Sequence, residues 1–103
     1  MSEQLKGNLD LLLLAVLRRG PGHGYAIIRR LADESDGRFD LPEGTVYPAL
    51  HRLEREGLVR STWDERGPRR RRIYAISGKG VRALANSRRE WTEFATGMRA
   101  VLG

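Results

Sequence analysis

The stretch that decides the fold reads EGTVYPALHRLEREG at residues 43–57, then Leu58-Val59, and later RGPRRRRIY at residues 66–74. Apolar side chains in its first part recur at i, i+3, i+4 and i+7, a spacing that places them on one face of an α-helix. We expect that face to pack in the core; it comprises Val46, Ala49, Leu50 and Leu53. The opposite face should be exposed, and it comprises Thr45, Tyr47, Pro48, His51, Arg52 and Arg55.

A β-hairpin is predicted directly after this helix. Gly57 is a typical helix stop. Residues 58–63 are rich in β-branched and aromatic side chains, residues 64–68 are turn formers, and residues 72–76 return as a second strand. A helix followed by a hairpin in this order indicates the second half of a winged helix-turn-helix, with the hairpin as the wing.

Positive charge is concentrated on the same elements. From Arg52 to Arg72 the chain has eight arginines and four acidic residues, so four of its six net positive charges lie there. Guanidinium groups suit bidentate contacts with phosphate or guanine and insertion into a narrow minor groove. A solvated hairpin tip is the plainer interpretation of an arginine run. Its position after a helix with hydroxyl, imidazole and guanidinium groups on one face favours binding to DNA.

Length and composition limit the fold to one compact unit. Among 103 residues we expect a winged helix-turn-helix over residues 1–76 and a C-terminal helix over residues 77–103, which makes the fold class α+β, mainly α. The absence of cysteine excludes disulfides and thiolate metal sites and agrees with a reducing cytoplasm. Nothing at the N-terminus has the pattern of a signal peptide, so a cytoplasmic protein is expected.

The N-terminal half supplies the other helices. Residues 9–17 read LDLLLLAVL, and leucines around the whole helix predict that one face packs in the domain and the other against a second subunit. A central helix in a compact bundle is the simpler alternative. A Gly- and Pro-rich turn at residues 20–24 ends this helix, and residues 25–31 begin the next. Residues 38–41 are expected to form an extended connector that pairs with the wing as a third strand.

The last helix is predicted from Ser77, a favourable N-cap, to Leu102. Its apolar residues follow a seven-residue repeat too short for an independent coiled coil, so we expect it to combine with the first helix in a homodimer. The expected dimer-interface residues are Leu9, Leu12, Leu13, Leu84, Trp91, Phe94, Met98 and Val101.

The chain has no pattern that indicates catalysis. It contains neither a Ser/His/Asp arrangement nor paired carboxylates at a characteristic spacing, so an enzyme is not expected, and neither is a cofactor or a metal. His23 stands in the glycine-rich turn, where it could sense pH or bind a metal, but with His51 as the only other imidazole a capping or packing role is favoured.

Three motifs together resemble the PadR family of bacterial transcriptional regulators. They are LLLLAVLRRGPGHGYAI at residues 11–27, EGTVYPALHRLEREGLV at residues 43–59 and GPRRRRIYAISGKG at residues 67–80. The short segment after the wing looks like the smaller PadR subgroup, which has a single short C-terminal helix. The resemblance implies a homodimeric repressor that often responds to a small aromatic or apolar effector.

The resemblance also implies roles for individual residues. Tyr47 would hold a phosphate beside Thr45, and a planar apolar effector would bind between subunits near Trp91, Phe94 and Met98. Trp91 is equally compatible with ordinary packing in the dimer core. The remaining DNA contacts implied along the helix and the wing are His51, Arg52, Arg55, Arg69, Arg70, Arg71 and Arg72.

Two other classes of function remain open at this point. A winged-helix module that binds protein or structured RNA, without a specific operator, would also suit a basic wing. A carrier of apolar molecules built around Trp91 would bind ligand without any operator. The leading hypothesis is a sequence-specific repressor that binds an inverted-repeat operator in double-stranded DNA as a homodimer.

Overall fold

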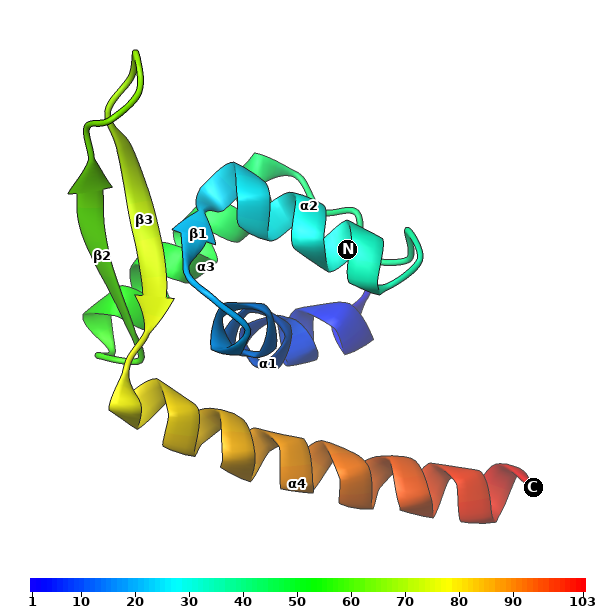
Figure 1. Cartoon of the computed structure of the whole chain (residues 1–103). Coiled ribbons are helices and arrows are strands. Elements are labelled where there is room, and N and C mark those ends of the chain that lie inside the picture. The colour runs from blue at the N-terminus through cyan, green and yellow to red at the C-terminus, as the bar shows by residue number, and fades with distance from the viewer.

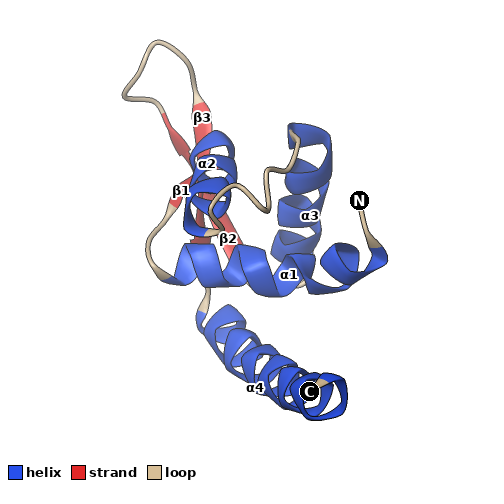
Figure 2. Cartoon of the chain, turned by 90° about the vertical axis from the view of Figure 1, so that its right-hand side faces the viewer, coloured by secondary structure: helices blue, strands red, loops and turns tan.

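The computed structural model describes residues 1–103, which form four helices and a three-stranded antiparallel sheet (Figure 1). This is a winged helix, mainly helical and of the α+β class, as predicted. The molecule measures 53 × 28 × 20 Å, because the last helix extends beyond the body of the domain (Figures 1 and 2). The elements in chain order are α1 (Glu3–Arg18), β1 (Gly22–His23), α2 (Gly24–Glu34), α3 (Glu43–Arg55), β2 (Val59–Asp64), β3 (Arg71–Ile76) and α4 (Gly78–Leu102).

One core joins the first three helices and the base of the hairpin. The apolar stripe predicted on α3 is confirmed: Val46, Leu50 and Leu53 have no exposed surface, and Ala49 is also buried. Full burial of each large apolar side chain contributes about 1.5–3 kcal/mol to folding. The stripe packs against apolar residues of α1, α2 and the sheet, namely Leu9, Leu13, Leu14, Val16, Leu17, Ile27, Ile28, Leu31, Val59 and Tyr74.

The sheet differs from the prediction in its third strand. Residues 38–41 do not pair with the wing; Arg38 and Phe39 lie in a turn, and Leu41 is buried in the core. The free edge of β3 is instead taken by β1, with Gly22 opposite Tyr74 and His23 opposite Ile73. The turn after α1 lies beside β3 and runs antiparallel to it, so this edge of the sheet is occupied and is not open to the later connector. The strand order is therefore β1-β3-β2.

Ser77 joins α4 to the rest of the domain. Its hydroxyl accepts a hydrogen bond from the Gly80 amide at 3.0 Å and donates one to the Gly57 carbonyl oxygen at 2.7 Å. The predicted N-cap is thus confirmed, and it also ties the start of α4 to the end of α3. By contrast Pro42, at the N-cap position of α3, contributes no side-chain bond.

Along α4, only the first part packs on the domain. Gly80 and Leu84 are its buried residues, and the helix then runs past α1 (Figure 1). The large apolar side chains of its second half are exposed. None of the helices in the structure combines the length and the apolar character that crossing a membrane requires.

The close approach at Gly80 predicts a large effect of adding one methyl group. A Cβ there would collide with the backbone carbonyl of Leu58 and lie 2.7 Å from Ile76 Cγ1. Because a backbone obstacle cannot rotate away, Gly80→Ala should lower the free energy of unfolding by about 1–3 kcal/mol, measured by urea denaturation. The matched control is Gly97→Ala in the same helix, where nothing lies within 4 Å. It should stabilise the protein by about 0.5–1 kcal/mol. Equal effects of the two changes would contradict this account of the junction.

Candidate nucleic-acid interface

The outward face of α3 carries the polar residues that the sequence placed there. His51 and Arg55 are exposed, and Thr45 and Tyr47 are half-buried. Tyr47 owes its position to Gly24, the first residue of α2, because a Cβ at position 24 would lie 2.6 Å from the Tyr47 hydroxyl oxygen. The missing side chain at residue 24 lets the phenol ring lie flat on the start of α2. The tyrosine therefore belongs both to the outer face and to the packing of the two helices.

A hollow of about 280 Å³ separates α3 from the wing, and we call it the wing hollow. Aromatic, imidazole and guanidinium groups make up its lining, and no acidic residue contributes to it. Such a lining offers positive charge, hydrogen-bond donors and flat apolar surfaces to one occupant. The lining residues are His23, Gly24, Tyr25, Tyr47, His51, Trp63, Arg70, Arg71, Arg72 and Tyr74.

Arg72 fixes the wing to α3. Its Nε and one terminal nitrogen donate to the Ser61 hydroxyl oxygen at 2.9 and 2.6 Å, and Ser61 in turn donates to Glu54 Oε2 at 2.6 Å. Glu54 Oε2 also lies 3.6 Å from Arg72. A residue predicted to contact DNA is thus largely occupied within the protein. Neither Ser61 nor Glu54 was identified from the sequence as part of this arrangement.

Trp63 holds two of the wing arginines. The guanidinium carbon of Arg70 lies 4.2 Å and that of Arg72 4.8 Å from the centre of the indole ring. Both distances are in the range of cation–π contacts. Arg70 also pairs with Glu65 Oε1 at 2.8 Å. Trp63 was not identified from the sequence as a site residue, although alternation along β2 places residues 59, 61 and 63 on the face that meets α3.

Arg69 and Arg71 differ from their neighbours. Both are exposed, and neither takes part in an ion pair or a side-chain hydrogen bond in the structure. Arg55 on α3 is free in the same sense. Among the arginines predicted to contact DNA, these three are the ones without a side-chain partner in the protein.

Arg52 was expected to contact DNA, but its side chain is bound to α1. Its two terminal nitrogens donate to the two carboxylate oxygens of Asp10 at 2.9 and 2.5 Å, and one also lies 3.3 Å from Glu56. These bonds, chiefly that to Asp10, raise the pKa of Arg52 further above its usual value. The residue joins α3 to α1 and has little capacity left for DNA. Periodicity placed it outside the apolar stripe correctly but did not reveal a partner 42 residues away.

The base of the wing tip is held by Asp64. One of its carboxylate oxygens accepts bonds from the Arg66 amide and Nε at 3.1 and 2.9 Å, and the other lies 3.1 Å from His23 Nε2. The bonds from Arg66, and then that from His23, lower the pKa of Asp64 far below its usual range. His23 occupies the N-cap position of α2 but makes no side-chain cap bond. It packs against the wing instead.

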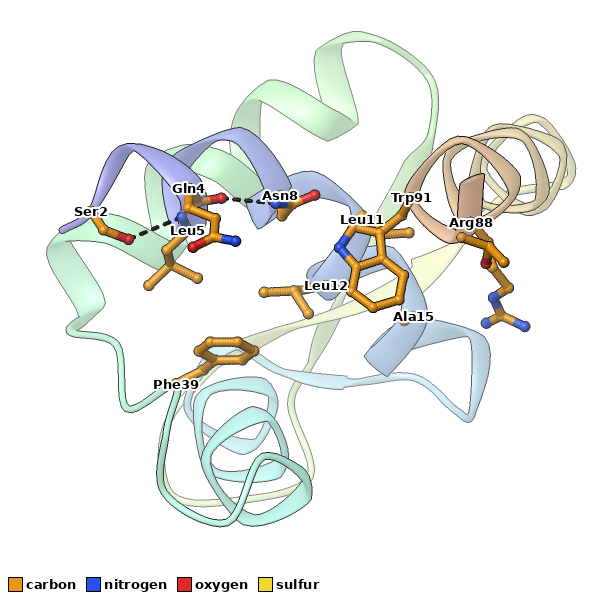
Figure 3. A pocket seen from close by; sticks show the side chains of 11 residues that line it. Ser2, Gln4, Leu5, Asn8, Leu11, Leu12, Ala15, Phe39, Arg88 and Trp91 are labelled. Atoms are coloured by element: carbon orange, nitrogen blue, oxygen red, sulfur yellow. Dashed lines mark hydrogen bonds between the residues drawn. The ribbon is translucent and has the colours of Figure 1, made fainter. Parts of the chain in front are cut away.

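A second concave surface lies on the other side of the domain, between α1 and α4. This α1–α4 groove has a volume of about 620 Å³. Figure 3 shows Trp91 and Phe39 on either side of Leu12, while Arg88 points away. Phe94 lines a neighbouring hollow with Asp10 and Glu90, and Met98 lines neither cavity. Neither of these two cavities therefore contains all three residues of the expected effector pocket.

The expected dimer-interface residues fall into two groups. Leu9, Leu13 and Leu84 are buried in the core of their own chain, with at most 7% of their surface exposed. Leu12 is half-buried in the α1–α4 groove. The residues of the second half of α4 are open to solvent: Trp91, Phe94, Met98 and Val101 expose 48, 59, 42 and 86% of their surface.

No group of three or more histidine, aspartate and glutamate side chains in the structure could hold a metal ion.

Comparison with known proteins shows the class to which this fold and interface belong. Residues 13–86 match the transcriptional regulator PadR-like family. The chain is 45% identical over 81 residues to the transcriptional regulator Rv3488 of Mycobacterium tuberculosis, covering 79% of this chain and 70% of that protein. The match to the transcriptional regulator YqjI of Escherichia coli, 27% identical, covers 82% of this chain but only 39% of that protein.

Solved structures agree with the sequence matches. A transcriptional regulator from Clostridium thermocellum has a TM-score of 0.89 at 28% identity, over 95% of this chain and 96% of that one. A PadR family transcriptional regulator from Eggerthella lenta has a TM-score of 0.86 at 34% identity, over 97% and 86% of the two chains. This protein belongs to the PadR-like family. It is a transcriptional regulator and not an enzyme, and membership of the family implies binding to DNA.

Proposed function

We propose that this regulator is a homodimeric repressor that binds an inverted-repeat operator and releases or tightens its hold when an apolar effector binds. The observation that carries the DNA-binding part is the wing hollow, which is lined by three arginines and four aromatic rings and contains no acid. Such a lining suits a polyanion with flat apolar parts. The proposal of repression rests on the family resemblance and on the expectation that a dimer bound to its operator blocks access to the DNA there.

In this proposal α3 is the reading helix, which enters the major groove. Its exposed residues His51 and Arg55 reach base edges or phosphates, and Thr45 and Tyr47 hold the backbone near the start of the helix. Arg69 and Arg71 on the wing contact the phosphates or the minor groove beside it, because their guanidinium groups have no partner within the chain. Arg52 and Arg72 do not contact DNA in this proposal. Arg52 holds α3 against α1 through Asp10, and Arg72 holds the wing against α3 through Glu54.

The apolar side chains exposed on α4 support the dimer. A row of large apolar groups in the second half of a helix is costly to leave in water, and a second copy related by a two-fold axis would cover it. The α1–α4 groove lies beside this row and shares Trp91 with it. An effector held there would touch α1, which Arg52 joins to the reading helix.

The first test concerns the free arginines. Replacing Arg69 and Arg71 together by Ala should weaken binding to operator and random duplex alike and lower the slope of log affinity against log salt by up to about 0.9 per lost phosphate contact. Stability should not change, because neither side chain has a partner in the protein. The charge-matched control removes Arg82 and Arg89 on α4 and should leave the slope unaltered. An unchanged slope in the wing variant would show that these arginines form only a solvated tip. A preference for structured RNA over duplex DNA would favour an RNA-binding module instead.

The second test concerns assembly. Met98→Asp places a charge in the proposed apolar interface and should convert the dimer into a monomer in sedimentation velocity, because the charge would lose its hydration there. Ala100→Asp adds the same charge two residues further on, roughly opposite on the helix, and should leave the dimer intact. In the intact dimer the reading helices should lie about 34 Å apart, one turn of DNA, so the operator half-sites should have that spacing. A wild-type protein that sediments as a monomer at micromolar concentration would exclude this assembly.

The third test concerns the effector. Trp91 and Phe39 border an apolar groove, and the carboxylate of Glu90 lines the adjoining hollow, so a planar and preferably cationic molecule is the ligand expected. Planar cationic dyes should quench tryptophan fluorescence, and Trp91→Ala should abolish that response while Trp63 still reports an intact fold. Operator DNA and dye should change each other's affinity by the same factor, since coupling is reciprocal. Quenching that survives Trp91→Ala would return Trp91 to dimer packing.

A further inference from the structure

Trp63 is an unusual residue for its position. It is the last core-side residue of β2 before Asp64, opposite Arg72 of β3, and half of its surface is exposed. Along the same face Val59 is buried in the core, and Ser61 bonds to Glu54 of α3. The indole continues this face beyond the core and into the wing hollow. A large apolar ring is thus left half open on the most basic surface of the protein.

Two positively charged groups hold the ring in place. Arg70 and Arg72 lie within 4.8 Å of its centre, and Arg72 is itself bonded to Ser61. The ring is therefore fixed from the side of the strand pair, and it also fixes the direction of both guanidinium groups. Loose surface tryptophans lack such restraint. The arrangement is a half-exposed indole ring with two guanidinium groups stacked over part of it.

A nucleic-acid strand has the complementary chemistry. Phosphates alternate along it with deoxyribose rings, whose carbon faces are apolar. A strand passing between α3 and the wing would set a sugar on the indole and its flanking phosphates near Arg70 and Arg71, with Tyr47 and His51 on the opposite wall. A free anion would use the arginines but would leave the indole face uncovered.

We infer that Trp63 is a DNA-contact residue that seats one deoxyribose of the strand crossing the wing hollow and directs Arg70 toward that strand. This inference rests on the proposed binding of DNA by α3 and the wing. It assigns a direct role to a residue that lies outside the arginine run and outside the reading helix. Because the contact is to sugar, it carries no sequence preference.

Removal of the indole should have a distinctive effect on affinity. Trp63→Leu should weaken binding to operator and to random duplex by the same factor, about three- to tenfold, because the indole–sugar contact is lost and Arg70 is no longer held in place by the ring. The salt slope should stay the same because every arginine remains. Trp63→Phe keeps an aromatic face and should recover most of the affinity. Loss of the slope in Trp63→Leu, or equal losses with Phe and Leu, would show that the indole serves only to hold the hairpin.

Fluorescence gives a direct test that does not depend on the loss of binding. The chain has two tryptophans, so Trp91→Phe leaves Trp63 as the only indole. Saturating duplex should reduce the quenching of Trp63 by acrylamide by roughly half or more, because an interface excludes water and quencher. Added salt that releases the DNA should restore it. The matched control, Trp63→Phe, leaves only Trp91, whose quenching by acrylamide should not respond to duplex.

The outcomes separate the two proposals. Duplex that binds the Trp91→Phe variant without protecting Trp63 overturns the inference about the indole and leaves the proposed function intact. Failure of the wild-type protein to bind any duplex overturns the proposed function itself. Protection of Trp63 by a mononucleotide at the same phosphate concentration would assign the wing hollow to a small ligand and also overturn the inference. Thermal unfolding of each variant checks that the hairpin is still folded.

Discussion

The hydrogen bonds that join Arg72, Ser61 and Glu54 hold the wing against α3, and the shape of the wing hollow depends on them. A two-stranded hairpin that projects from a small domain is only marginally stable by itself. Here the guanidinium of Arg72 lies across β2, contacts Trp63, and is joined through Ser61 to Glu54 of α3. The wing and α3 are thereby connected by side chains as well as by the chain between them. Arg69 and Arg71 can then remain unpaired on a surface whose shape is already fixed.

The two sides of the domain carry different chemistry, and α1 lies between them. On one side, basic and aromatic groups surround the wing hollow; on the other, apolar groups line the α1–α4 groove and continue along α4. Asp10 has a position on both sides, since it binds Arg52 of α3 and lines the hollow next to Phe94. Both terminal nitrogens of Arg52 donate to Asp10, so a displacement of Asp10 would act on α3 through two hydrogen bonds.

Periodicity and capping were enough to predict most of the fold. The stripe of Val46, Leu50 and Leu53 gave α3 and its orientation, and Ser77 gave the start of α4, because both signals depend on residues a few positions apart. The prediction that residues 38–41 form the third strand was wrong. Which short segment pairs with the edge of β3 depends on where the chain leaves α1, and that position cannot be read from local sequence. Two residues, Gly22 and His23, are too few to produce a strand pattern.

The sequence pattern predicted which side chains of the site are exposed, but not which of them form ion pairs within the protein. His51, Arg55, Arg69 and Arg71 are exposed as the pattern indicated, whereas Arg52 is taken up by an acid far away in the sequence. Arginines that cannot be told apart by sequence pattern therefore have different surroundings in the structure. Nor does the pattern distinguish a leucine buried by its own chain from one available to a partner, as Leu13 and Leu12 illustrate, since both occur in one apolar run.

The unbroken course of α4 has a consequence for how such a regulator could change its target during evolution. Leu84 anchors the helix in the core, and Trp91 and Met98 lie one and two heptads further along it with no proline or kink between them. Each residue added to an α-helix turns everything beyond it by about 100° and moves it by about 1.5 Å. An insertion or deletion between Leu84 and Trp91 would therefore rotate the exposed apolar row relative to the wing. The angle between the proposed dimer surface and the proposed DNA-binding surface is thus set by the number of residues between Leu84 and Trp91, and substitutions that keep this number leave it unchanged.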